Sequence, residues 1–69
     1  MQAQLDRLAR DLIARRPGAA HQAMLDAVEA VLIRAALAHT QGNQLRAAEV
    51  VGINRITLKK RMDELGIGK

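Results

Sequence analysis

The chain has 69 residues, of which 49% are hydrophobic and 26% are charged. This is the composition of one small globular domain with a thin core. It contains no Cys, which excludes disulfides and zinc–thiolate sites, and no Phe, Tyr or Trp, which excludes aromatic platforms for single-stranded nucleic acid. The longest unbroken apolar runs have four residues, so neither a membrane span nor a signal-peptide core is predicted. We therefore expect a soluble, cytoplasmic protein.

Positive charge is concentrated in the C-terminal part of the chain. The formal net charge is +4, from 11 Lys and Arg against seven Asp and Glu. Residues 1–41 carry five basic and four acidic side chains, whereas residues 42–69 carry six and three. Residues 54–61 hold four cations and no acid. Such a block predicts a polyanionic partner, although a solvated helix face has the same pattern.

The first predicted helix covers Gln2 to Arg15. One apolar stripe recurs at helical spacing, formed by Leu5, Leu8, Ala9, Leu12 and Ile13. Pro17 should end the helix, because the residue before a proline is pushed out of the helical region.

The second predicted helix covers Ala20 to Thr40 and is apolar around most of its circumference. Only a narrow stripe, which begins with Gln22, Asp26 and Glu29, is polar. A helix of this kind is normally buried, and 69 residues are too few to cover it. We therefore expect one side to pack within the domain and the other to pack on a second copy; a tight monomeric four-helix bundle is the alternative. The residues predicted to form the dimer interface are Leu5, Leu8, Leu12, Met24, Val28, Val31, Leu32 and Ala35.

Two short helices are predicted next, from Gln44 to Val51 and from Arg55 to Leu65. Each follows an asparagine, the residue type that caps helix N-termini. Gly42 suits a left-handed C-cap after Thr40, and Gly66 suits the same position after the last helix, with Ile67 folding back onto its final turn. Asp63 and Glu64 lie near a helix C-terminus, where acids oppose the macrodipole, and are expected to be solvated.

The turn between these two helices has the layout of a helix-turn-helix. Gly52 can adopt positive φ and make a sharp turn at little cost, and Ala48 is small enough for the helices to cross closely. A small shared core and an inward stripe on the last helix are predicted from Ala47, Val51, Ile53, Leu58, Met62 and Leu65.

In a helix-turn-helix the second helix enters the major groove of DNA, led by its N-terminal residues. Arg55 could then pair with guanine, Asn54 with adenine or a phosphate, and Ile56 with a thymine methyl group. The predicted phosphate or groove-edge contacts are Asn43, Arg46, Thr57, Lys59 and Lys60. The placement of Arg61, on the DNA face or in solvent, stays open.

Several segments of the sequence resemble the Fis family, which includes the nucleoid protein Fis and the C-terminal domains of NtrC-like enhancer-binding activators. The segments that carry this resemblance are residues 38–44, 46–55, 57–62 and 64–67. The resemblance implies an all-α, four-helix protomer and an obligate homodimer on double-stranded DNA. It also implies one Fis-type domain over residues 1–69, with dimerisation helices in 1–41 and the helix-turn-helix in 42–69. The residues that match DNA-contacting positions of the family are Asn43, Asn54, Arg55, Thr57, Lys59 and Lys60.

Some positions depart from the Fis pattern. Leu45 replaces a hydroxyl residue near the phosphates, and Ile56 replaces Gly or a polar residue. The N-terminal arm of Fis is absent, and Asp63 and Glu64 stand where Fis is basic. We therefore expect the DNA-binding domain of an NtrC-like transcriptional regulator, with a stand-alone, nucleoid-associated Fis-like DNA-bending protein as the alternative. An NtrC-like regulator would reach sigma-factor-dependent RNA polymerase through domains outside this chain.

Three other classes of function agree less well with the sequence. The chain lacks a nucleophile–base pair, since His21 and His39 are the only histidines and no Cys or Ser is present, so no enzymatic activity, catalytic residue, metal site or cofactor is predicted. A membrane-surface helix would require Trp or Phe beside its cations. A protein-interaction dimer that binds no nucleic acid remains as the alternative from a different class.

Overall fold

The computed structural model describes residues 1–68, which form four helices and no strand. They are α1 (Gln2–Arg15), α2 (Ala20–His39), α3 (Gln44–Val51) and α4 (Arg55–Leu65). The predicted all-α class is confirmed, and the bounds of α1, α3 and α4 match those predicted. Helix α2 ends one residue earlier than predicted.

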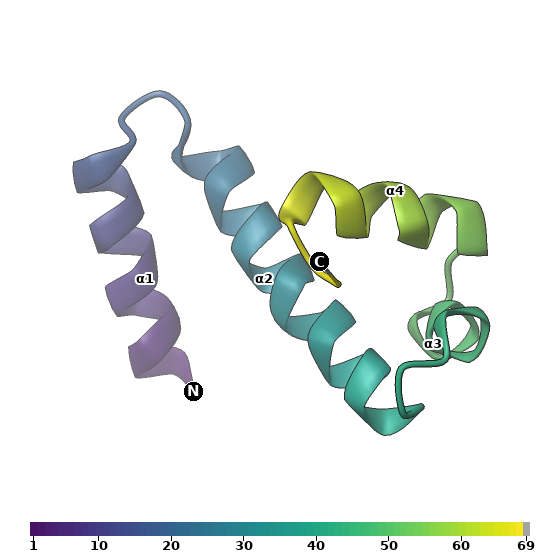
Figure 1. Ribbon diagram of the computed structural model, residues 1–69. Helices are drawn as coiled ribbons and strands as arrows, with labels where there is room; N and C mark the ends of the chain where they lie inside the picture. Colours follow the sequence, from purple (N-terminus) through teal and green to yellow (C-terminus); the bar gives the residue numbers. More distant parts are fainter. Residues whose placement is uncertain (69) are drawn as a thin grey trace.

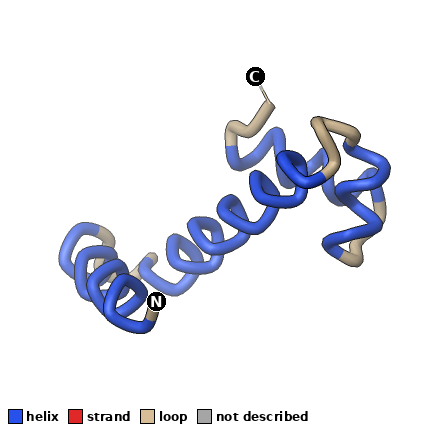
Figure 2. The backbone as a smooth tube through the Cα atoms, turned by 90° about the horizontal axis from the view of Figure 1, so that it is seen from below, coloured by secondary structure: helices blue, strands red, loops and turns tan. Residues whose placement is uncertain are grey.

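Helix α2 is the axis of the molecule. Helix α1 runs antiparallel to it as the other arm of a hairpin, whereas α3 and α4 lie on its opposite side (Figure 1). The view in Figure 2 shows α2 as a rod that joins α1 at one end to the α3–α4 pair at the other. Helix α1 contacts α2 but neither α3 nor α4. The four helices therefore do not close into the tight monomeric bundle that was the alternative prediction.

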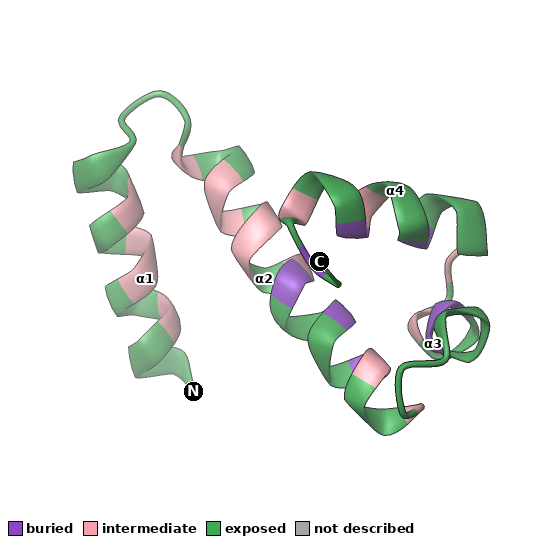
Figure 3. Cartoon of the chain, in the orientation of Figure 1, coloured by how far each residue is buried: buried purple, intermediate pink, exposed green. Residues whose placement is uncertain are grey.

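The core lies where α2, α3 and α4 meet (Figure 3). Ile33 of α2 and Leu58 of α4 are fully buried at its centre. Ala47 and Ala48 of α3 are also buried, and their small side chains let α3 approach its neighbours closely, as the sequence predicted. The remaining buried residues are Ala30, Ala36, Met62 and Ile67, with Leu37, Val51, Ile53 and Leu65 partly buried around them.

The end of α2 differs from the sequence prediction in one detail. Gly42 has positive φ (82°) as expected, but Gln41 before it is also left-handed (φ 53°). The amide of Gly42 donates to the carbonyl of Leu37 at 2.8 Å, and that of Gln41 donates to Ala38 at 3.4 Å. The left-handed segment that ends α2 therefore begins at Gln41, one residue before the predicted Gly42. The Thr40 hydroxyl donates to the Ala36 carbonyl at 3.0 Å and holds the last turn closed.

The turn between α3 and α4 is built on Gly52, as predicted. Its φ of 91° lies in the left-handed region, and its amide donates to the Ala48 carbonyl at 2.8 Å. The Ile53 amide donates to the same carbonyl at 3.0 Å. Glycine makes this geometry cheap because it has no Cβ to clash with the following carbonyl.

The single chain is more extended than a compact monomer. Its radius of gyration is 13.4 Å, against about 11 Å for a compact domain of 69 residues. Its accessible surface is 5242 Å², about 1,000 Å² more than the size scaling for folded monomers gives. The excess arises because α1 stands apart from α3 and α4 and has no buried residue.

Candidate nucleic-acid interface

A groove of about 630 Å³ separates the start of α3 from the start of α4. Its lining combines four predicted DNA-contacting residues, Asn43, Arg55, Ile56 and Lys59, with Gly42, Gln44 and Leu45. Residues from two segments about ten positions apart therefore lie around one concave surface. The groove is open to solvent, with Ile56 75% exposed and Leu45 55% exposed, so it can receive a large partner.

Both helices begin with an asparagine that caps their first turn. Oδ1 of Asn43 accepts a hydrogen bond from the Arg46 amide at 3.0 Å, and Oδ1 of Asn54 accepts one from the Ile56 amide at 2.7 Å. The predicted capping roles are confirmed. Because each side-chain oxygen is engaged with backbone, the NH₂ group of each asparagine is the part left to donate outward.

The cations in and near the groove differ in whether an acidic side chain neutralises them. Within the described residues 1–68, the side chains of Arg55 and Lys60 form no ion pair. Lys59 lies 3.3 Å from the carboxylate of Asp63, one helical turn away. Both partners of that pair are more than half exposed, and exposed pairs of this kind are weak. Lys59 can therefore exchange Asp63 for a phosphate.

The remaining predicted DNA contacts do not line the groove. Asn54, Thr57 and Lys60 are exposed near the start of α4 or along it. Arg46 lies on the side of α3 that faces a shallow hollow bordered by Thr40 and Glu49. All eight predicted contacts are exposed, as a nucleic-acid interface requires.

The side chain of Arg61 faces α2 instead of the groove. Its Nε donates to Glu29 at 2.5 Å, and its Nη2 donates to Asp26 at 2.8 Å. Its Nη1 donates to Glu64 of its own helix at 2.6 Å. The sequence left two positions open for Arg61, on the DNA face or in solvent. In the structure it occupies neither and instead binds these three acids. Asp63 and Glu64 are exposed, as expected, and each also pairs with a cation of α4.

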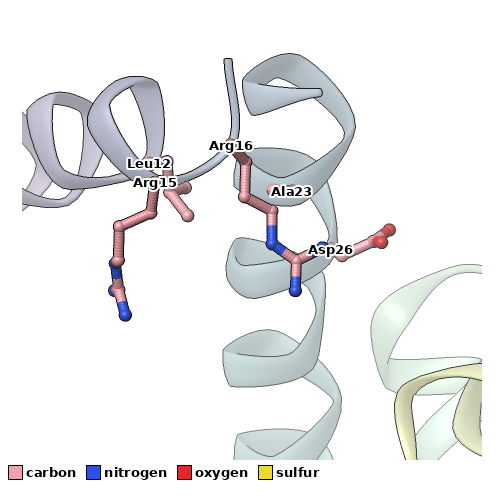
Figure 4. Close-up of a pocket in the computed structure, with 5 residues that line it drawn as sticks. All are labelled: Leu12, Arg15, Arg16, Ala23 and Asp26. Atoms are coloured by element: carbon pink, nitrogen blue, oxygen red, sulfur yellow. The ribbon is translucent and has the colours of Figure 1, made fainter. Parts of the chain in front are cut away.

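The polar stripe of α2 supplies two of the three acids in the cluster around Arg61, namely Asp26 and Glu29. The Asp26 carboxylate points away from Arg15 and Arg16, the cations at the α1–α2 turn (Figure 4). A hydrogen bond from Gln22 (2.8 Å) and then one from Arg61 lower the pKa of Asp26 below its usual value. Hydrogen bonds to Glu29, Glu64 and Asp26, in that order, raise the pKa of Arg61. Asp26 and Arg61 are therefore both charged at neutral pH.

A second surface, on the α1–α2 hairpin, is apolar. Val28, Val31 and Leu32 of α2 are 46%, 67% and 52% exposed, and Ala35 beside them is also exposed. Of the other predicted dimer residues, those that are half-buried are Leu5, Leu8, Leu12 and Met24. The predicted set therefore divides into half-buried residues of the hairpin and an outward face of α2.

Two further residues extend this outward apolar face. Ile13 of α1 is 62% exposed and Leu25 of α2 is 50% exposed, and both border a shallow apolar hollow between the helices. Neither residue belongs to the set predicted for the dimer interface. Leu25 was predictable from helical spacing, because it lies on one line of α2 with His21, Val28 and Leu32.

Among residues 1–68, no helix has the length and apolar character needed to cross a membrane. They also contain no group of three or more His, Cys, Asp or Glu placed to hold a metal ion.

Comparisons with known proteins agree with the geometry. The model of the family described as "Bacterial regulatory protein, Fis family" matches residues 24–65. The chain is 49% identical, over 74% of its length, to the "DNA-binding transcriptional regulator NtrC" of Bradyrhizobium sp. (strain RP501 Parasponia), of which the match covers 10%. It is 37% identical, over 86% of its length, to the "DNA-binding protein Fis" of Glaesserella parasuis serovar 5 (strain SH0165), of which the match covers 60%.

A second Fis protein, from Psychromonas ingrahamii (strain DSM 17664 / CCUG 51855 / 37), is 42% identical over 75% of the chain and is covered over 52% of its own length. The chain thus spans a tenth of the NtrC relative and little more than half of the Fis relatives. No solved structure matches. The family match covers more than half of the chain, and the chain belongs to the Fis family of bacterial regulatory proteins.

Proposed function

We propose that this chain binds double-stranded DNA with sequence preference, as a homodimer, and that it is the DNA-binding domain of an NtrC-like transcriptional regulator. The observation that carries the proposal is the groove between the starts of α3 and α4. It combines the cations Arg55 and Lys59, two capped helix N-termini and the exposed side chain of Ile56 on one surface. Helix N-termini favour anions, and the cations add the charge that phosphate binding needs.

The surface divides between base reading and phosphate contact. Arg55, in the first turn of α4 and without an ion-pair partner among residues 1–68, is free to pair with both acceptors of guanine. Ile56 beside it presents an apolar surface to a thymine methyl group. Lys59, Lys60, Arg46 and the amide group of Asn43 fit phosphates, and Thr57 fits the edge of the DNA groove. Asn54 fits adenine or a phosphate.

The apolar outward face of α2 supports the homodimer. Its exposed side chains Val28, Val31 and Leu32 would otherwise be hydrated, and large contiguous apolar patches on soluble proteins usually mark an interaction site. The excess accessible surface of about 1,000 Å² is close to the ~800 Å² that each partner buries in an interface of standard size. A dimer also explains why α1 has no buried residue in the single chain.

Two observations favour an NtrC-like regulator over a Fis-like DNA-bending protein, which remains the alternative. The NtrC relatives of Bradyrhizobium and Rhizobium meliloti (strain 1021) are 49% and 45% identical to this chain, against 37% and 42% for the Fis relatives. In addition, Asp63 and Glu64 pair with Lys59 and Arg61 and so reduce the positive charge of α4. In an NtrC-like protein the contact with sigma-factor-dependent RNA polymerase would lie in other domains.

A salt titration of duplex binding tests the proposal. The logarithm of the association constant falls against the logarithm of salt concentration with a slope of about −0.9 for each neutralised phosphate. We expect a slope that corresponds to several contacts per dimer when binding to a fluorescent duplex is followed by anisotropy. Binding that is absent, or that does not respond to salt, would contradict it and would favour a protein-interaction dimer without nucleic acid.

A further inference from the structure

Arg61 makes the long-range polar contacts of this fold. Within residues 1–68, its hydrogen bonds to Asp26 and Glu29 are the only side-chain hydrogen bonds that join two different helices. They connect residues 35 and 32 positions apart in the sequence. The other polar pairs, such as Lys59 with Asp63, lie within one helix.

The cluster sits between the two surfaces described above. Helix α4 carries Arg55 and Lys59 of the groove, whereas α2 carries the outward apolar face with Val28 and Val31. Leu58 and Met62 give the α2–α4 contact an apolar centre. Apolar packing permits sliding and rotation more readily than a fixed set of hydrogen bonds does. The guanidinium is planar and presents its donors in a rigid fork. The three carboxylates around it therefore define one orientation of the Arg61 side chain.

Arg61 is also shielded from a role in DNA contact. Its side chain is 24% exposed, whereas that of Lys59 is 60% exposed. Three nitrogens of its guanidinium already donate to carboxylates at 2.5–2.8 Å. Contact with a phosphate would require it to leave these acids, and the acids themselves repel phosphate.

We infer that Arg61 is a positioning residue that ties α4 to α2 and so fixes the separation and angle at which a dimer presents its two α4 helices to DNA. This inference rests on the proposed DNA-binding dimer. A dimer engages two sites on one duplex only if its geometry spans them. A flexible α2–α4 junction would therefore weaken binding without removing a single DNA contact.

Distances between the two α4 helices of a dimer test the inference directly. The chain has no Cys, so a spin label attached through Lys60→Cys marks each α4 once, and pulsed electron spin resonance measures the distance between labels without DNA. We expect one narrow distribution in the parent. Arg61→Gln should broaden or shift it, and Arg61→Lys, which keeps the charge but loses the fork, should have a smaller effect.

A matched pair of acid variants separates geometry from charge. Glu29→Gln and Glu64→Gln each replace a carboxylate bound to Arg61 by a neutral amide, but only Glu29 lies on α2. We expect Glu29→Gln to broaden the distribution and Glu64→Gln to leave it as in the parent. These milder substitutions, at side chains that are 35% and 47% exposed, keep the test valid even if Arg61→Gln fails to fold, which circular dichroism would show.

Salt dependence on DNA gives the second readout. On random-sequence duplex, Arg61→Gln should weaken binding severalfold with the same salt slope, whereas Lys60→Gln should also flatten the slope by about one contact per protomer. A flatter slope for Arg61→Gln would assign Arg61 to phosphate contact and overturn the inference. Unchanged distances in Arg61→Gln and Glu29→Gln would also overturn it while leaving the dimer intact. A chain that gives no distance at all between labels would instead contradict the proposed dimer, and the inference with it.

Discussion

Gly52→Ala should destabilise the fold by about 1–2 kcal/mol, because a Cβ is strained in the left-handed region. The φ of 91° is the cause, since a Cβ at this position would meet no neighbouring atom within 4 Å. Urea unfolding at a fixed protein concentration measures the loss. Gly52→Asn is the control, since asparagine tolerates this region better, and it should lose less. Equal stability of the parent and the Ala variant would show that the turn is not constrained as described.

The residues that begin and end the helices were the most predictable part of this molecule. Asn43 and Asn54 cap α3 and α4 as expected, because an asparagine before a helical run has a local role that needs no knowledge of the fold. Gly52 was predictable for the same reason. The role of Arg61 was not, since its partners are 32 and 35 residues away and meet it only once α2 and α4 cross.

Arg55→Ala should cost about 1–3 kcal/mol of binding free energy on a preferred site and relax base preference at one position. Lys60→Ala should weaken binding to all duplexes more evenly, because phosphates carry no sequence. Selection of a preferred site from a random duplex library, followed by anisotropy on that site and on random DNA, compares the two variants. If both behave alike on the two kinds of DNA, the division into base reader and phosphate contact is wrong.

At the scale of the helices, periodicity and breakers predicted most of the fold. Pro17, Gly42, Gly52 and Gly66 divide the chain where the structure divides it. Periodicity could not predict which apolar side chains of α2 pack within the chain and which stay exposed. In the structure, Ile33 and its neighbours pack against α3 and α4, whereas Val31 is exposed to solvent. The polar stripe of α2 faces Arg61.

Val31→Glu should prevent dimerisation or unfold the chain, because it places a charge at the centre of the outward face of α2. Val50→Glu is a matched control, since Val50 lies on α3 and is similarly exposed (58% against 67% for Val31). Size-exclusion chromatography with light scattering should show the control as a dimer. A Val31→Glu variant that is folded, dimeric and able to bind DNA would show that this face is not the interface.

The α2–α4 cluster should make stability depend on acid pH. Asp26 has a pKa below its ordinary value of 3.8 in the folded chain. It therefore contributes stability that is fully present above about pH 4 and is lost as pH falls through the lowered folded pKa. Unfolding free energies of the parent and Asp26→Asn, measured against pH at one protein concentration, should differ near neutrality and converge in acid. A difference that does not change with pH would exclude this contribution.

At the scale of the whole molecule, the single chain is more extended than a compact monomer and leaves an apolar face of α2 uncovered. The charge block and the helix-turn-helix layout predicted a DNA-binding surface, and the structure brings Asn43, Arg55 and Lys59 of that predicted surface together around one groove. The sequence also predicted that α2 has more apolar surface than 69 residues can cover. The face that stays uncovered depends on where α1 packs, and Ile13 was missed for that reason.

Analytical ultracentrifugation, alone and with duplex DNA, tests the central claim most directly. The claim is that two chains join through the outward faces of α2 and present paired α4 helices to successive grooves about 34 Å apart. We expect a species of twice the 7.5 kDa mass of one chain, which binds one duplex as an intact pair. A stable single chain at the concentrations that saturate DNA would contradict the account.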